Sequence, residues 1–214
     1  MSEKGILFSG KMVRAILDGR KSMTRRVIKP QPVGSECFGI CTDSTDTKNI
    51  GKVGFGEDEQ AMQYIKQPFK SGDTLYVKET WARGTNPQNP SSYFCYRADM
   101  DENAQTIQKW NTSLFMPKEA ARIYLRVTDV SVEKLQDISV QDALDEGIRV
   151  HANGCIDGLA FGCYNGDECH YNRCTRLIEY FRKLWDKLSG KRKNCTWSDN
   201  PYVWVIEFER IEEE

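Results

Sequence analysis

Apolar positions recur at helical spacing in three stretches of the chain. Residues 10–18 carry an apolar stripe between Ser9, a candidate N-cap, and Gly19, a candidate C-terminal glycine. Residues 140–146 lie between Ser139 and Gly147 in the same arrangement. Residues 175–188 form the clearest amphipathic stripe, which is typical of a helix that packs against a core. We therefore expect helices at these three places.

Alternating apolar and polar residues, or short continuous apolar runs, predict the strands. They fall at residues 6–8, 23–28, 74–81, 93–99, 123–130 and 202–210. Because side chains alternate along a strand, the second of these strands should carry Thr24 and Arg26 on one face. Arg25 and Val27 should then lie on the other face.

Polar stretches separate the predicted elements at about residues 33–66, 100–112 and 149–174, and the first and third of them are rich in glycine. Since long surface loops cost little free energy to close, we interpret these stretches as insertions into a single domain that spans residues 1–214. Several strands with a few connecting helices are typical of the α+β class. We expect a small, mostly antiparallel β-barrel with flanking helices and turn-rich insertions.

Composition limits the classes of function. The 30 basic and 31 acidic residues leave a net charge of −1, which excludes a globally cationic nucleic-acid binder, so any attraction to phosphate must come from a local patch. No apolar run approaches the length of a membrane span, and we expect no membrane partner. The first ten residues lack the apolar segment of a secretory signal, so we expect a cytoplasmic protein.

Residues 19–30 provide such a local patch, with five cations and two hydroxyls in twelve positions. The segment joins the first predicted helix to the second predicted strand. Lys21 would open the loop after the helix and Thr24 would enter the strand, so the two side chains can converge on one small pocket. The alternative is that the cations complement the helix dipole or form a solvated face.

The chain contains eight cysteines, which without a secretory signal indicate reduced thiols or a metal site rather than disulfides. Cysteines with His170 nearby could clip one loop around a tetrahedral zinc ion. The candidate ligands are Cys155, Cys163, Cys169 and Cys174. Their spacing departs from the tight pairs of known zinc knuckles, so unliganded cysteines in a variable loop are the alternative.

The segment GRKSMTRRVIKP resembles the signature of the ASCH domain family, whose members carry a G-[RK]-K-x-x-T-x-R-like element at the start of a PUA-like β-barrel. Other segments resemble those of the larger phage and prophage members. They are PFKSGDTLYVKETW, YRAD, the MPKEAARI run, LQDIS with the following DA and EG pairs, and WSDNP. The resemblance covers most of the chain outside the three insertions and implies a PUA-like barrel.

The small ASCH amidohydrolases remove acyl groups from N4-acylated cytidine-type nucleosides, and the resemblance implies a similar site here. Lys21 would act as a base because neighbouring cations and burial lower an amine pKa, and Thr24, or a water molecule that it positions, would attack the acyl carbon. Glu146 matches the catalytic glutamate of these enzymes and would be the general acid. We expect substrate contacts from Arg25, Arg26, Tyr76, Glu79, Trp81 and Arg122. This chemistry requires no cofactor.

Each of these residues also has a structural interpretation. Trp81 could be a core aromatic, Arg122 could form a structural ion pair, and Glu146 could be a solvated residue before a helix cap. Two other functions stay open, namely a non-catalytic RNA or modified-base binding module and a single-strand ribonuclease. An amidohydrolase needs a closed pocket around a nucleoside, whereas the others need an open basic groove for single-stranded RNA.

Overall fold

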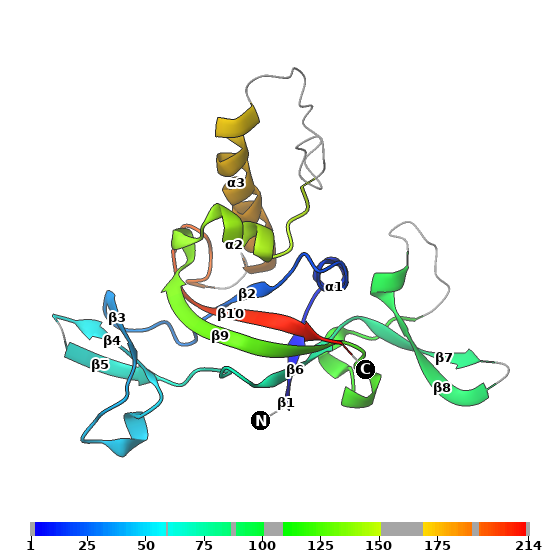
Figure 1. Cartoon of the computed structure of the whole chain (residues 1–214), viewed down its shortest axis with the longest axis horizontal. Coiled ribbons are helices and arrows are strands. Elements are labelled where there is room, and N and C mark those ends of the chain that lie inside the picture. Colours follow the sequence, from blue (N-terminus) through cyan, green and yellow to red (C-terminus); the bar gives the residue numbers. More distant parts are fainter. Residues whose placement is uncertain are drawn as a thin grey trace.

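The computed structural model describes residues 3–58, 60–86, 89–100, 109–150, 169–189 and 193–212, and within these ranges all side chains except those of residues 85, 86, 89–92 and 169–175. Five strands form the main sheet in the order β1-β6-β9-β10-β2 (Figure 1). Their bounds are β1 Glu3–Leu7, β2 Met23–Val27, β6 Thr74–Lys78, β9 Tyr124–Lys134 and β10 Tyr202–Ile211. Only the β1–β6 pair in this sheet is parallel, which confirms the predicted α+β class with mostly antiparallel strands.

The three predicted helices are present in the described residues. Their bounds are α1 Gly10–Leu17, α2 Val140–Asp145 and α3 Cys169–Ser189. Helix α2 begins with a capping box in which Ser139 and Asp142 bind each other's backbone N–H groups. Gly19 and Gly147 follow α1 and α2 at φ values of +69° and +93°, as the predicted C-terminal glycines require. Ser9 precedes α1 without a side-chain capping bond.

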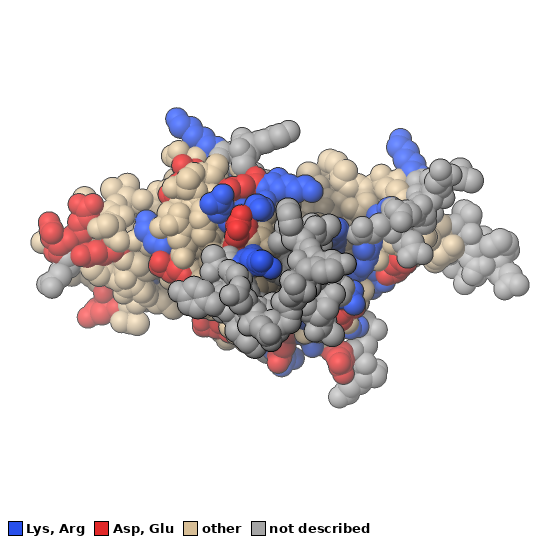
Figure 2. Space-filling model, turned by 90° about the horizontal axis from the view of Figure 1, so that it is seen from above, with Lys and Arg blue, Asp and Glu red and all other residues tan. Residues whose placement is uncertain are grey.

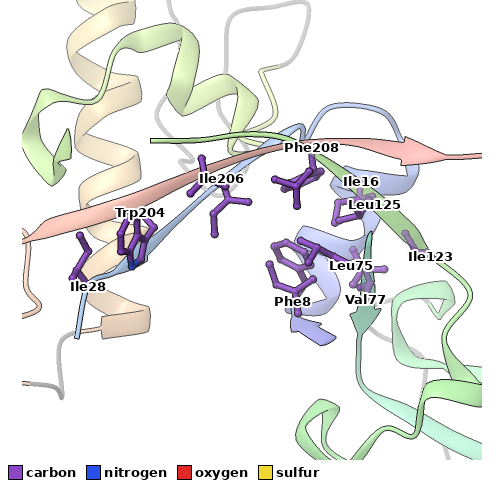
Figure 3. Packing of buried hydrophobic residues seen from close by; sticks show 14 of the residues in the cluster. Phe8, Ile16, Ile28, Leu75, Val77, Ile123, Leu125, Trp204, Ile206 and Phe208 are labelled. Carbon is purple, nitrogen blue, oxygen red and sulfur yellow. The ribbon is translucent and has the colours of Figure 1, made fainter. Parts of the chain in front are cut away.

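The side chains of β10 alternate between two hydrophobic clusters. Trp204, Ile206 and Phe208 face the first cluster, which is shared with β1, β6, β9 and α1 (Figure 3). Val203 and Val205 face the second cluster, which is shared with α2 and α3. β10 is therefore covered on both faces, and its neighbour β2 lies at the boundary of the two clusters.

The main sheet is strongly curved, and the long strands β9 and β10 bend along their length (Figure 1). β1 and β2 are its two edge strands. Arg26 of β2 reaches across and donates its Nη2 hydrogen to the carbonyl oxygen of Leu7 at the end of β1, at 2.7 Å. A side chain thus joins the two edges at one corner, where a fully closed barrel would use backbone hydrogen bonds.

The stretch interpreted as the first insertion forms a separate three-stranded antiparallel sheet. Its strands are β3 Glu36–Ile40, β4 Val53–Glu57 and β5 Gln60–Ile65. Val53 and Phe55 of the central strand are buried in the first hydrophobic cluster, and the Phe55 ring packs edge-on against Tyr202 with a centroid distance of 5.4 Å. This sheet therefore contributes to the main core.

Several predicted strands have different limits in the structure. The strand predicted over 6–8 is β1, which ends at Leu7, and the one predicted over 93–99 ends at Tyr96, after which Arg97–Asp99 form a 3-10 helix. The strand predicted over residues 74–81 ends at Lys78, and β7 (Trp81–Asn86) then pairs with β8 (Asn89–Tyr96). The break has a local cause, since the Glu79 N–H donates to the Met116 sulfur and the Thr80 carbonyl accepts from the backbone of Arg97. The strand predicted over 123–130 continues to Lys134, because β10 pairs with its whole length.

Candidate functional site

The loop after α1 brings Lys21 against the end of α2. The N–H groups of Arg20 and Lys21 both donate to the Ala15 carbonyl, at 2.8 and 3.0 Å, which turns the chain sharply after the helix. Gly147 makes the close approach feasible, because a Cβ at this position would lie 2.8 Å from the Ala15 Cβ and 3.0 Å from the Lys21 Cβ. Lys21 and Glu146 consequently form an isolated antiparallel bridge.

The Lys21 side chain is completely buried. Its Nζ donates to the Met23 carbonyl at 2.7 Å, to the Glu146 carbonyl at 2.9 Å and to Glu146 Oε2 at 2.7 Å. Burial lowers the pKa of Lys21, an effect that the ion pair with Glu146 opposes without cancelling and that the nearby Arg26 and Arg25 reinforce. The protonated amine has three acceptors, and its lowered pKa means that it loses its proton more easily than an exposed lysine does.

The Glu146 carboxylate contacts both the Lys21 amine and the backbone that follows Thr24. Its Oε1 accepts from the backbone N–H of Arg25 at 2.7 Å, while its Oε2 holds the Lys21 amine. Lys21 binds the Met23 carbonyl, so the two ionic side chains hold the peptide groups immediately before and after Thr24. The structure thus brings together the three residues that the sequence nominated for catalysis.

Thr24 is buried, with 2% of its surface exposed. Strand alternation places it on the same face of β2 as Arg26, as predicted. On this side lies the ring of Phe8, whose centroid is 5.6 Å from Lys21 Nζ and 5.2 Å from the Arg26 guanidinium carbon. Phe8 was not among the residues nominated from the sequence.

Arg25 points to the opposite face of β2, where it is enclosed by acidic residues. Its buried guanidinium donates to Glu133 at 2.6 Å and to Asp142 at 2.8 Å. Burial opposes ionisation of Asp142, but bonds from Ser139 and Arg25 outweigh it and the pKa of Asp142 is lowered. For Glu133 burial dominates over Arg25, and its pKa is raised. Arg25 is therefore engaged within the protein and is not open to a ligand.

A concavity of about 340 Å³ lies on this same side of the sheet. It is lined by Ser22, Met23, Thr128, Asp142, Asp145, Glu207 and Phe208. Since Met23 and Thr24 alternate along β2, the concavity opens on the face of the strand that Thr24 does not share. It is acidic, and we do not assign it to the chemistry of Thr24.

Glu79 and Arg122 form a second charged cluster with Asp99 and Tyr96, in which Glu79 is buried and Asp99 is exposed. Arg122 donates to Glu79 at 2.9 and 3.2 Å and to Asp99 at 2.8 Å, and its guanidinium carbon lies 3.9 Å from the Tyr96 ring centroid. Burial raises the pKa of Glu79, although Arg122 opposes the shift. The structural ion pair named as the alternative for Arg122 is present.

Trp81 and Tyr76 also lie apart from the Lys21 cluster. Trp81 is buried with Met116 and Ala120, with Tyr96 packed against this group. Tyr76 lies on the outer face of the sheet, because its ring covers Gly5, where an added Cβ would meet the ring at 2.9 Å. The aromatic residue beside the Lys21 amine is instead Phe8. A short strand followed by a helix cap is a weak sequence signal, and it could not reveal this contact.

The candidate zinc ligands cannot be placed, because Cys155 and Cys163 lie outside the described residues, as do the side chains of Cys169 and Cys174. Among the side chains that are described, no group of three or more His, Cys, Asp or Glu residues is arranged to hold a metal ion. Four cysteines in the described part are free thiols: Cys37, Cys41, Cys95 and Cys195.

The chain is similar to one solved structure, and matches neither a family model nor a curated protein. A crystal structure of an ASCH domain from Lactobacillus crispatus JV V101 is similar over 98% of this chain and 79% of its own, with 11% sequence identity and a TM-score of 0.35. No helix in the described part is long and apolar enough to cross a membrane.

Proposed function

We propose that this protein is an amidohydrolase that removes the acyl group from N4-acylated cytidine-type nucleosides. The observation that carries the proposal is the buried Lys21–Glu146 pair, which holds both peptide groups that flank the Thr24 hydroxyl. An amine, a carboxyl group and a hydroxyl in this arrangement are the parts of a nucleophilic mechanism. The sequence resemblance of residues 19–30 to the ASCH signature suggests the substrate class.

The first half-reaction starts with one proton transfer within the ion pair. Moving a proton from Lys21 Nζ to Glu146 Oε2, across 2.7 Å, creates a neutral amine and a carboxylic acid. The lowered pKa of Lys21 favours this state. The amine takes the proton of Thr24 as its oxygen attacks the acyl carbon, and Glu146 gives its proton to the departing cytosine nitrogen. The products are an acyl-threonine ester and the free nucleoside.

The second half-reaction restores the site. Glu146, now a carboxylate, takes a proton from a water molecule that attacks the ester carbonyl. The C–O bond to Thr24 breaks, and Lys21 returns its proton to the hydroxyl. The acyl group leaves as a carboxylic acid, so one water is consumed and no cofactor takes part. Phe8 and Arg26 share the Thr24 face of the strand, and we expect them to contact the substrate.

Two observations disfavour the open basic groove that an RNA reader or a ribonuclease needs. Arg25 is buried and engaged by Glu133 and Asp142. On the face seen in Figure 2, basic and acidic side chains are interspersed among the described residues. These alternatives therefore become outcomes of the same test.

The test is to incubate the purified protein with a panel of N4-acylated cytidines and with short RNAs, and to follow the products by mass spectrometry. We expect release of cytidine, and losses of about a hundredfold or more in turnover for Lys21→Met, Thr24→Val and Glu146→Gln. Because residues that act as a unit are not additive, a double variant should be scarcely worse than a single one. Thr128→Val, at an exposed strand threonine, is the matched control and should keep full activity.

Full activity of the Thr24→Val variant would exclude Thr24 as the nucleophile. RNA binding that survives all three changes, in a protein that hydrolyses no acylcytidine, would establish the reader instead. Cleavage of the short RNAs, lost in the same variants, would establish the ribonuclease.

A further inference from the structure

The Arg122 guanidinium is held in a fixed plane by two carboxylates. Four of its five N–H groups donate to Glu79 and Asp99. Glu79 is itself 1% exposed and cannot move aside easily. Arg122 lies just before β9, Glu79 directly follows β6, and Asp99 belongs to the 3-10 helix Arg97–Asp99. Three separate segments therefore fix one planar group.

Tyr96 covers one face of this plane, with its ring centroid 3.9 Å from the guanidinium carbon. The Tyr96 hydroxyl donates to the Ala120 carbonyl at 2.8 Å, which fixes the ring in turn. Even so, 27% of the Arg122 side chain remains exposed. Tyr96 covers one face and the carboxylates take four of the five donors, so the exposed part comprises the opposite face, the remaining Nη1 N–H and the aliphatic stem.

A second observation comes from the same cluster. The indole nitrogen of Trp81 is buried and is the only such side-chain atom without a hydrogen-bond partner among the described residues. Tyr96 packs against the group that contains Trp81. Leaving a buried N–H unpaired destabilises a fold, and such conflicts concentrate at functional sites. Tyr96 thus contacts both the Arg122 guanidinium and the group that contains the unpaired Trp81 indole N–H.

We propose that the open face of Arg122 is a stacking site for an uncharged planar heteroaromatic ring, such as a nucleobase. Guanidinium planes stack on such rings, and here the plane is already oriented before a ligand arrives. The cluster carries two carboxylates against one guanidinium, and four of the five guanidinium donors point to those carboxylates. The site therefore selects against phosphate and recognises the base rather than the backbone of a nucleotide. It is distinct from the Thr24 chemistry and does not depend on it.

The test uses the full-length protein labelled with ¹⁵N. Adenosine, ribose and inorganic phosphate are titrated separately, and the Nε–H signals of the arginine side chains are followed. Adenosine should shift the Arg122 signal, whereas ribose and phosphate should not. A short oligoadenylate, compared with adenosine, distinguishes a single nucleoside from single-stranded RNA as the source of the ring. Adenosine carries no acyl amide, so the result is independent of whether Thr24 hydrolyses anything.

Variants separate stacking from charge. Arg122→Lys keeps the positive charge but removes the planar guanidinium group, and should weaken adenosine binding at least about tenfold. Arg126→Lys is the matched control, since Arg126 is an exposed arginine of β9 whose carboxylate partner, Glu209, lies at 4.0 Å. Tyr96→Phe keeps the ring and should keep binding.

Two outcomes would overturn the proposal. One is an Arg122 signal that adenosine leaves unchanged or that phosphate shifts equally, and the wild-type spectrum alone decides this even if Arg122→Lys does not fold. The other is unchanged adenosine affinity in a folded Arg122→Lys protein.

Discussion

Lys21 combines complete burial with an ion pair, and the balance between them sets its chemistry. Burial disfavours the charged amine, Glu146 favours it, and the net result is a pKa below the ordinary value of 10.5. A lowered pKa suits a base, but it also means that the folded protein is destabilised whenever the Lys21 amine is protonated. An exposed lysine in this loop would have neither the lowered pKa nor the cost in folding stability.

This balance predicts a pH dependence with a definite sign. In the window between the lowered pKa of folded Lys21 and the value of 10.5, the unfolded chain binds more protons at this position than the folded protein. Lys21 should therefore make the free energy of unfolding rise with pH across that window. We expect an NMR titration of the Lys21 Cε signal, assigned by its loss in Lys21→Arg, to show a midpoint below 10.5. A midpoint above that value would mean that the ion pair outweighs burial.

At the scale of elements, Arg25 joins β2 to α2 and β9. It binds Asp142, which is also part of the capping box of α2, and Glu133, which is on β9. Helix α2 ends at Asp145, directly before Glu146, so the position of the proposed acid depends on how this short helix is anchored. The Nη1 of Arg25 also lies 3.7 Å from Glu146 Oε1, so Arg25 is a positioning residue for the proposed acid.

Replacing this arginine should be costly. Arg25→Met leaves two partly buried carboxylates without their partner, and we expect a loss of about 3 kcal/mol in the free energy of unfolding, measured by urea denaturation. Arg25→Lys restores the charge but not the forked geometry, and should recover only part of this loss. Arg126→Ala, at an exposed arginine, should change stability by no more than about 0.5 kcal/mol. A small effect of Arg25→Met would show that α2 is anchored by its apolar contacts alone.

At the scale of the whole molecule, the first predicted insertion is physically part of the core. Phe55 of β4 is fully buried in the cluster that also contains β10 and β6. The small sheet and the main sheet should therefore unfold together. An appended sheet without such a residue would unfold on its own.

This cooperativity predicts the effect of truncating Phe55. Phe55→Ala should lower the free energy of unfolding by about 3–5 kcal/mol and keep a single transition, as for other large-to-small changes in a core. Phe38→Ala is the matched control on the adjacent strand β3, where the ring is 41% exposed, and should have an effect of about 0.5 kcal/mol or less. A separate early transition in Phe55→Ala, followed by calorimetry, would show that the two sheets are independent.

The sequence predicted the elements well where the signals are local. Gly19 and Gly147 mark the helix ends, and the alternation of Thr24 and Arg25 along β2 is as expected. The strand limits at Lys78 and Lys134 were not predictable, because they depend on which distant backbone groups compete for hydrogen bonds. Propensity and periodicity act over a few residues, whereas strand pairing is decided by the whole sheet.

The same distinction holds for the candidate site. The sequence by itself placed Lys21 and Thr24 in one turn, since a helix end followed by a strand fixes their separation. Only the tertiary structure decided that Glu146, 125 residues after Lys21, binds the Lys21 amine and the backbone N–H that follows Thr24, and that Glu79 and Arg122 form a cluster of their own. The physical reason is that contacts between distant residues are set by strand order, close packing at Gly147 and the burial of charge, none of which a local pattern encodes.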